Sequence, residues 1–338
     1  MKSAFLQACR GEKSEYVPVW FMRQAGRYLP GYRELRKNYS MLSLIRNPGL
    51  AAEIAIEPVL SLGVDAAILF SDILLPFPAM GVRVEFSELG GPVFPEPLRK
   101  PEDLQKLQPV NPTKEMAFLG EQISLLSGKL RGVPIIGFAG APFTLAAYAI
   151  EGEYSRGFEI TKSFIYRNEK SWHQMMKILT EITTNLLKGQ IRSGVNAVQL
   201  FDSWIGALSP VDFRNYVLNY LEEIFSETSQ VPRIYFGTNT GGLLRDISKL
   251  DIEVVGLDWR VELESAFQAL GGNRAIQGNL DPACLLGPIE HIESEASNII
   301  LAGKSAPGHI FNLGHGIHKS TDPSVAKHLV DFVHKFRS

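Results

Sequence analysis

The chain has 338 residues, 45% of them hydrophobic and 21% charged, which is typical of a globular protein with a substantial core. Its net charge of −2 argues against binding to nucleic acid, because phosphate neutralisation needs a basic face. No apolar run approaches the length of a membrane span, so we expect no membrane contact. The two cysteines, Cys9 and Cys284, are too few for a disulfide framework or a CxxC metal site. These features, and the lack of a signal-peptide pattern, predict a cytoplasmic protein.

Positive charge is concentrated near the N-terminus, where residues 1–50 hold nine basic and three acidic side chains. Gly26, Pro30 and Gly31 interrupt the segment 18–36 and predict a loop rather than a regular helix. Forked, permanently charged guanidinium groups match carboxylates, so this segment predicts a site for several of them. The alternative is a solvated loop whose arginines pair with surface acids. The four arginines of the segment are Arg23, Arg27, Arg33 and Arg36.

Short runs of Val, Ile, Leu and Phe alternate with longer segments of helical period, a pattern typical of parallel βα units. The eight expected strands span residues 18–22, 66–70, 134–138, 197–201, 233–236, 254–257, 275–277 and 309–313. The clearest helices are expected at residues 49–62, 161–188, 210–225, 261–270, 288–302 and 323–336. Ser209-Pro210 and Asp322-Pro323 are good helix starts, each with a capping residue before a proline.

Eight such units predict an α/β fold, a single-domain (β/α)₈ TIM barrel spanning residues 1–338. Residues 80–122, rich in Pro and Gly, are expected to form an excursion after the second strand. In a barrel of this kind the active site lies at the carboxyl ends of the strands, where the residues that follow each strand form a ring. That ring brings the arginines, an isolated aspartate and a histidine to one face, as a small-molecule site requires. Its expected members are Arg23, Arg27, Ser71, Asp72, residues 140–142, Asp202, Ser203, Trp204, Thr238, Asn239, Asp258, Asn279, Asp281 and His315.

The same residues carry a family resemblance. Residues 18–27 (PVWFMRQAGR) and 137–152 (GFAGAPFTLAAYAIEG) resemble the two signature motifs of the uroporphyrinogen decarboxylase family. Shorter matches follow in the family's order along the chain: FSDIL at 70–74, FDSW at 201–204, GLDW at 256–259, QGNLDP at 277–282 and FNLGHG at 311–316.

The resemblance implies an enzyme of haem and tetrapyrrole biosynthesis that uses no metal and no cofactor. It would remove carbon dioxide from the four acetate side chains of uroporphyrinogen III, leaving the methyl groups of coproporphyrinogen III. The resemblance also implies a homodimer.

A macrocycle with eight carboxylates needs several cationic anchors, and its pyrrole N–H groups need one central acceptor. Arg23 and Arg27 suit the first task and Asp72 the second. An Asp72 carboxylate would oppose the positive charge that grows when a ring carbon is protonated. Its alternative roles are a cap for the next turn or a partner for an arginine. Because a guanidinium is a poor acid, we expect electrostatic and orienting roles for both arginines.

His315 is expected to donate to a substrate carboxylate or to relay a proton, since imidazole titrates near neutrality. Its alternative is a histidine bonded to backbone in a glycine turn. By resemblance, Tyr148 and Ser203 also touch the substrate, although core packing and helix capping are the ordinary roles of such residues. Gln24 and Ala25, with Gly26 of the same motif, are expected to bind substrate through backbone amides. Arg36 reaches another substrate acid or pairs at the surface with Glu34.

Two other functions compete with this interpretation. Related methyl-transferring barrels hold zinc through grouped cysteine and histidine ligands, whereas Cys9 and Cys284 lie far apart in this sequence and no His-x-Cys pair exists. A porphyrinogen carrier would need the arginines and the aromatic residues but not Asp72. That aspartate therefore separates an enzyme from a carrier.

Overall fold

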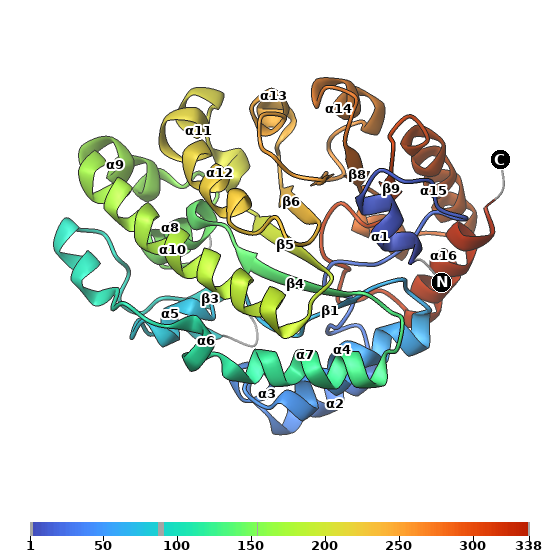
Figure 1. The fold of residues 1–338 in the computed structure, drawn as a ribbon, viewed down its shortest axis with the longest axis horizontal. Helices are drawn as coiled ribbons and strands as arrows, with labels where there is room; N and C mark the ends of the chain where they lie inside the picture. Colours follow the sequence, from blue (N-terminus) through green and yellow to red (C-terminus); the bar gives the residue numbers. More distant parts are fainter. Residues whose placement is uncertain (1–2, 87–90, 154, 337–338) are drawn as a thin grey trace.

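Seven short parallel strands form one curled sheet through the centre of the molecule (Figure 1). The computed structural model describes residues 3–86, 91–153 and 155–336. Each strand pairs in parallel with the next, so the chain returns over the outside of the sheet between strands. In order of pairing the strands are β1 (Ala67–Ile68), β4 (Ile135–Gly140), β5 (Ala197–Asp202), β6 (Arg233–Gly237), β7 (Val254–Gly256), β8 (Ala275–Gln277) and β9 (His309–Ile310).

The sheet is closed by the segment that was expected to be the first strand. Val19 forms an isolated parallel bridge with Phe311, just beyond β9. On its other side, the Asp65 N–H donates to the Val19 carbonyl at 2.8 Å, and the Val19 N–H donates to Asp65 Oδ2 at 2.7 Å. Residues 18–22 therefore lie between β9 and the segment leading into β1. The barrel prediction is confirmed, with the first strand reduced to a bridge.

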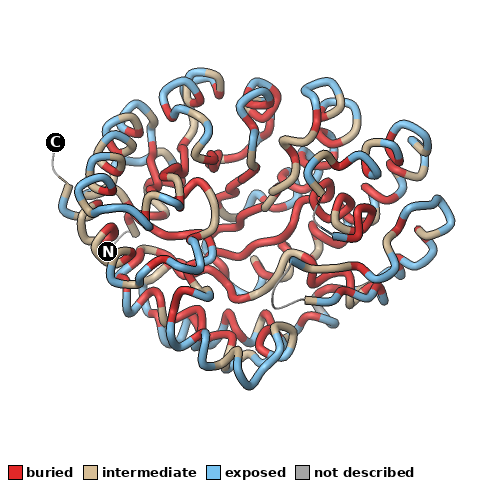
Figure 2. Tube along the Cα trace, turned by 180° about the vertical axis from the view of Figure 1, so that it is seen from behind, coloured by how far each residue is buried: buried red, intermediate tan, exposed pale blue. Residues whose placement is uncertain are grey.

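Helices cover the outside of the sheet, and their inward faces are buried (Figures 1 and 2). The start signals at Ser209 and Asp322 are confirmed, because each side chain accepts a hydrogen bond from the first turn of its helix. The covering helices are α1 (Ala4–Cys9), α4 (Pro48–Leu62), α7 (Ala117–Lys129), α8 (Pro142–Glu151), α10 (Glu169–Ser193), α12 (Leu218–Ser226), α13 (Leu244–Ile247), α14 (Leu263–Ala269), α15 (Ile289–Gly303) and α16 (Pro323–Lys335).

Two of the expected helices are each broken in two. Residues 161–188 fall in α9 (Glu159–Arg167) and α10, which Asn168 separates with φ −132° and ψ 46°. Residues 210–225 fall in α11 (Pro210–Tyr216) and α12, with a break at Val217. Asparagine and valine are weak helix formers, which favours a break at these positions. The periodic pattern of apolar residues does not reveal the breaks, because the helices on both sides cover the same core.

The arginine segment departs from the expected loop. Helix α2 (Pro30–Asn38) begins inside it, and α3 (Met41–Ile45) follows directly. Proline at the first helical position costs nothing, because its missing N–H has no partner there, so Pro30 starts the helix instead of preventing it. The prediction of an irregular loop is wrong from residue 30 onwards and holds only for residues 23–29.

The expected excursion after β1 contains little regular structure before α7. It has a small antiparallel hairpin of β2 (Glu85–Phe86) and β3 (Pro92–Val93), the 3₁₀ helix η1 (Pro101–Lys106) and α6 (Pro112–Glu115). Residues 87–90 of the excursion lie outside the described residues. The last expected residues, 117–122, already belong to α7, so the excursion ends earlier than expected. The remaining short elements are α5 (Pro76–Ala79), η2 (Ile205–Ala207), η3 (Gly241–Leu243) and η4 (Pro282–Leu286).

A short chain of amide hydrogen bonds lies in the buried interior of the barrel. Trp20 Nε1 donates to Gln277 Oε1 at 2.9 Å, and Gln277 Nε2 donates to Gln199 Oε1 at 2.9 Å. All three side chains are at most 1% exposed. Because buried polar groups are costly unless paired, these bonds tie the bridging segment to β8 and β5.

We predict that Asp65→Ala destabilises the barrel at its closure. The carboxylate accepts the Val19 N–H and the Tyr16 hydroxyl, each at 2.7 Å, and lies 2.7 Å from His334 Nε2 of α16. Losing a charged acceptor shared by these donors should cost roughly 2–4 kcal/mol of unfolding free energy, measured in urea. Glu34→Ala, which removes an exposed ion pair with Lys37, is the control and should cost less than about 1 kcal/mol. Equal losses in the two variants would show that Asp65 has no special role in closure.

Candidate active site

A cleft of about 610 Å³ opens at the carboxyl ends of the strands. Its apolar wall includes Phe70, Phe138, Phe201 and Phe236, which come from or follow β1, β4, β5 and β6. Among the residues that the structure describes on its wall, the fully charged side chains are Arg23, Arg27, Arg36, Lys319 and Asp72. Four cations therefore face one carboxylate.

Arg23 and Arg27 are exposed on this wall. Within the described ranges, no hydrogen bond or ion pair joins either guanidinium to another protein group. Arg23 has φ 61°, a left-handed conformation that is uncommon outside glycine. Two unpaired guanidinium groups at the mouth of a cleft are suited to holding carboxylates that the protein itself does not supply. The alternative of surface pairing is wrong for these two arginines.

Asp72 follows β1 and is half-buried. Burial raises the pKa of its carboxyl group, while the Leu74 N–H and the charge of Arg23 oppose that shift. Its Oδ1 accepts the Leu74 N–H at 2.8 Å, so the turn-capping alternative is also correct. One oxygen is thus fixed by the turn, and this bond orients the carboxylate at the cleft wall.

His315 lies on the cleft wall, with its ring edge-on to Phe236 and Trp259 at centroid distances of 6.5 and 6.3 Å. Burial lowers its pKa to about 4, helped by the nearby positive charges of Arg23 and Arg260. The expectation that this imidazole titrates near neutrality is therefore wrong for the unliganded protein. At pH 7 the ring is neutral and offers one N–H and one acceptor nitrogen.

Ser203 follows β5 and lines the cleft. Its carbonyl accepts the Thr238 hydroxyl at 2.6 Å. The next helix, η2, has Trp204 as its N-cap and no side-chain cap bond, so helix capping is not the role of Ser203.

Tyr148 is partly exposed but is not among the residues that line the cleft. Its ring packs edge-on against Trp204 at 5.4 Å, as the core-packing alternative expects. Burial raises the pKa of Tyr148 to about 12, and the negative charge of Asp72 contributes to that shift. The hydroxyl is therefore protonated at neutral pH and lies within electrostatic reach of Asp72.

Gln24 is the main correction among the predicted binding residues. Ala25 and Gly26 line the cleft, but the Gln24 side chain is fully buried and is absent from the wall. Its backbone N–H donates to the Phe21 carbonyl at 3.0 Å, so this amide is not offered to a ligand. The prediction failed because the left-handed turn at Arg23 directs the next residue inward.

The remaining two arginines of the segment, Arg33 and Arg36, have different contacts. Arg33 donates to the carbonyls of Arg27 and Tyr28 at 3.1 and 2.7 Å, which fixes the loop from within. Arg36 lines the cleft and donates to the Tyr39 carbonyl at 2.6 Å. Glu34 pairs with Lys37 instead, so the Arg36–Glu34 pair that we considered is not formed.

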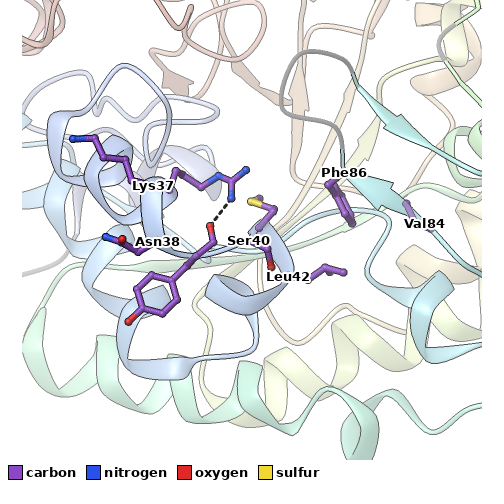
Figure 3. A pocket seen from close by; sticks show the side chains of 9 residues that line it. Lys37, Asn38, Ser40, Leu42, Val84 and Phe86 are labelled. Carbon is purple, nitrogen blue, oxygen red and sulfur yellow. Dashed lines mark hydrogen bonds between the residues drawn. The ribbon is translucent and has the colours of Figure 1, made fainter.

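A smaller pocket of about 340 Å³ adjoins the cleft and shares Arg36, Met41 and Phe86 with it (Figure 3). Residues 37–42 form one side of this pocket, and Val84 and Phe86 of the hairpin form the other. The cleft therefore continues sideways past Arg36 toward the hairpin.

The expected ring of strand-end residues includes several that are structural. Asp202 is fully buried and accepts from Thr144 Oγ1 at 2.7 Å and from Tyr235 OH at 2.9 Å. Burial raises its pKa to about 6. Asp258 is also fully buried and accepts the backbone N–H groups of Asn239 and Arg260. Both carboxylates hold strand ends together and do not line the cleft.

The sequence analysis missed the phenylalanine wall and Lys319. Phe201 pairs with Phe236, and Phe138 stands two residues before Gly140, the partner of Phe201. Aromatic side chains near the ends of neighbouring parallel strands are a signal that alternation alone does not provide, because buried strands are apolar throughout.

Two further observations concern metals and membranes. Among the described residues, no three His, Cys, Asp or Glu side chains gather as metal ligands would. None of the helices in this part of the chain combines the length and apolarity needed to cross a bilayer.

The barrel and its cleft together define a class of protein: a (β/α) barrel with an apolar, cation-rimmed site around one carboxylate, suited to a poly-acidic small molecule. Comparison with known proteins identifies the family. The family model described as "Uroporphyrinogen decarboxylase (URO-D)" matches residues 1–336. Proteins named uroporphyrinogen decarboxylase from Carboxydothermus hydrogenoformans and Thermodesulfovibrio yellowstonii are each 45% identical to this chain, with 100% of the chain and 97% and 99% of the relatives covered. The chain belongs to the uroporphyrinogen decarboxylase family.

Among solved structures, a methyltransferase from Methanosarcina mazei has a TM-score of 0.82 at 20% identity, covering 98% of this chain and 97% of that one. A B12-independent methionine synthase from Shewanella has a TM-score of 0.61 at 12% identity, with 88% and 90% covered. At these identities the likeness concerns the fold, and it agrees with the barrel derived above.

We predict that His315 titrates far below an ordinary histidine. Its pKa is 6.5 in an unfolded chain and about 4 in the fold, so only the unfolded state takes up the proton between these values. Folding therefore loses free energy as the pH falls from 6.5 to 4. An NMR titration of the ring should have its midpoint near pH 4, and His315→Gln should flatten the loss of stability over this interval. A midpoint at 6.5 or above would contradict the neutral ring.

Proposed function

We propose that the cleft binds uroporphyrinogen and catalyses loss of carbon dioxide from its four acetate side chains, giving coproporphyrinogen. The observation that carries the proposal is the single half-buried carboxylate, Asp72, in a cleft where Arg23 and Arg27 have no partner in the described part of the chain. Membership of the family supports the reaction. The bonding needs of the macrocycle support the placement.

The peripheral carboxylates of the substrate match the cationic rim. Arg23, Arg27, Arg36 and Lys319 supply four positive charges on one wall. Each charge-assisted hydrogen bond to a carboxylate contributes about 1.5–3 kcal/mol. Because the two unpaired guanidinium groups break no protein ion pair when substrate binds, most of that free energy is available for binding.

The pyrrole rings match the inner wall. Phe138, Phe201 and Phe236 offer an apolar surface of aromatic side chains, which favours contact with the faces of the flexible macrocycle. Such a surface also excludes water from the reacting centre. Water exclusion strengthens every charge interaction there.

Asp72 would act at the centre of the macrocycle. A proton from solvent added to the ring carbon next to the one that bears the acetate arm makes an iminium-like ring, which accepts the electron pair released when the bond to carbon dioxide breaks. The exocyclic methylene formed in this way then takes up a proton, and the ring carbon gives up the proton that it gained, which leaves a methyl group. The carboxylate accepts the pyrrole N–H groups and opposes this positive charge. At about 4 Å and an effective dielectric near 20, such a pair is worth on the order of 4 kcal/mol. Only the share realised in the transition state raises the rate.

The raised pKa of the Asp72 carboxyl group is consistent with this role. Burial destabilises the charged form of Asp72, and a cationic substrate ring would offset that penalty. The carboxylate is therefore stabilised most when the ring is charged, which is the differential stabilisation that catalysis needs.

His315 would then act as a neutral hydrogen-bond partner of a substrate carboxylate. A ring whose pKa is about 4 keeps one N–H at neutral pH but lacks the acidic proton of an imidazolium, so acting as a general acid requires a bound carboxylate to raise that pKa first. Ser203 would bind another acid arm through its hydroxyl. Tyr148, whose ring packs against Trp204, would interact with the Asp72 carboxylate through its hydroxyl.

The methyl-transfer alternative fits the cysteines poorly. Cys9 lies in α1 and Cys284 in η4, and among the residues that the structure describes neither belongs to a group of three or more possible metal ligands. On the family resemblance we extend the proposal to a cytoplasmic homodimer that works without metal or cofactor.

The direct test is anaerobic incubation of the purified, metal-free protein with uroporphyrinogen, following the products from eight carboxyl groups to four. Retention of all eight groups, with tight binding, would favour a carrier instead. Turnover that appears only after zinc is added would favour the methyltransferase-like alternative.

We predict that Asp72→Asn keeps much of the substrate binding but lowers kcat about 100-fold or more, because the amide retains an oxygen for the Leu74 N–H and loses the charge. Steady-state kinetics with uroporphyrinogen measure this. Asp322→Asn is a matched control, since Asp322 also accepts a backbone N–H two residues ahead at 2.8 Å but caps α16. Unchanged turnover in Asp72→Asn would refute the mechanism.

We predict that Arg27→Ala raises KM about tenfold and lowers kcat by a smaller factor, because losing one anchor of about 1.5–3 kcal/mol should lower kcat/KM roughly 10- to 150-fold. Arg46→Ala provides the control, because Arg46 is an exposed arginine of the same basic segment that does not line the cleft. Normal kinetics for Arg27→Ala would remove that arginine from the substrate site.

A further inference from the structure

Arg23 is held in an unusual backbone conformation by groups that do not touch the cleft. Its φ of 61° costs free energy for a residue with a side chain, so the surrounding structure must impose it. The Arg23 side chain also lies directly against Gly316. A Cβ on that glycine would overlap with Arg23 Cδ and stand 2.7 Å from Cγ. Any larger residue at position 316 would displace the guanidinium.

Asn312 fixes the residue before Arg23. It lies just beyond β9, its side chain is fully buried, and its Oδ1 accepts the Met22 N–H at 3.1 Å and the Leu313 N–H at 2.8 Å. The Met22 carbonyl in turn accepts the Ile317 N–H at 2.9 Å. Met22 is therefore held at both its N–H and its carbonyl by the segment that carries His315.

Gln24, the residue after Arg23, is held in place by its own side chain. Its fully buried side chain accepts the Phe21 N–H at 3.1 Å and donates to the Ala66 carbonyl at 2.9 Å. The turn is thereby tied to the segment that leads into β1 and Asp72. Two buried amide side chains thus hold the residues on either side of Arg23: Asn312 reaches Met22 from just beyond β9, and Gln24 reaches from the turn to Ala66 ahead of β1.

We propose that Asn312 and Gln24 are positioning residues that keep Arg23 in its left-handed turn and so aim its guanidinium into the cleft beside Asp72 and His315. This rests on the proposed function, in which Arg23 binds a substrate carboxylate. The two amide side chains fix the backbone conformation at Arg23. Gly316, which has no side chain, leaves room for the Arg23 side chain.

The Nδ2 group of Asn312 agrees with a role centred on Oδ1. Within the described residues this buried Nδ2 has no hydrogen-bond partner. The protein therefore uses Asn312 chiefly as an acceptor. Asn312→Asp keeps the accepting oxygen, replaces the unpartnered NH2 group by a second oxygen, and is the conservative variant.

The test is a double-mutant cycle between positions 312 and 23, read as kcat and KM with uroporphyrinogen. Asn312→Ala should lower kcat/KM roughly tenfold to hundredfold, the scale of a misplaced catalytic group. In an Arg23→Ala background the same substitution should change kcat/KM less than twofold, because its effect acts through Arg23. An undiminished effect in that background would overturn the proposal.

Three further variants separate positioning from general loss of stability. Gly316→Ala keeps both amides but displaces the Arg23 side chain, so it should reproduce the kinetic defect. Asn312→Asp should restore most of the activity lost in Asn312→Ala. Asn196→Ala is the matched control, since Asn196 Oδ1 also accepts a strand N–H, that of Ile135 at 2.8 Å, but at the opposite end of the barrel. It should leave kcat/KM unchanged.

A crystal structure of Asn312→Ala gives a readout that does not depend on activity. Residue 23 should leave the left-handed region, or its guanidinium should turn away from the cleft. An Arg23 that keeps φ near 61° and its original direction would overturn the positioning role, even if the enzyme is active. A wild-type protein without decarboxylase activity would instead refute the proposed function, and the crystallographic result would still decide the positioning role.

Discussion

The structure depends on the way residues 18–22 close the barrel. This segment has one bridge to the strand on one side, at Phe311, and on the other side it pairs with Asp65 through that residue's backbone and carboxylate. A side chain here replaces part of a missing strand ladder. The closure also sets the direction of the chain as it leaves the barrel, and Arg23 comes directly after it. The same few hydrogen bonds of residues 18–22 therefore stabilise the closure of the barrel and fix the position of Arg23 at the cleft.

Burial and positive charge oppose each other at Asp72 but act together at His315. The cleft gathers cations whose carboxylate partners are not part of the protein, and it places one acid where burial raises its pKa. Burial, with the positive charges of Arg23 and Arg260, keeps His315 neutral. Asp202 and Asp258, by contrast, are buried deeper but are satisfied by neighbouring strand ends. The arrangement separates acids that hold the barrel together from the one acid that faces a ligand.

Much of the fold was predictable, because parallel strands buried on both faces are continuous apolar runs and the residues after them must share one rim. Asp72 and His315 were found in this way. The breaks at Asn168 and Val217 were not, since the apolar period continues through both. The helix that begins at Pro30 was missed because proline both starts and stops helices. Gln24 was misassigned because its burial depends on a left-handed turn at a non-glycine residue, which no local pattern announces.

The unpaired arginines also determine how the cleft interacts with dissolved ions. A rim with four cations and one acid attracts counterions from solution, and substrate must displace them on binding. Part of the affinity for a poly-acid then comes from releasing these ions, and this part weakens as ionic strength rises. Phosphate, sulfate or a carboxylic buffer would occupy the same guanidinium groups. The apparent preference of the cleft for its substrate is thus a property of the surrounding electrolyte as well as of the chain.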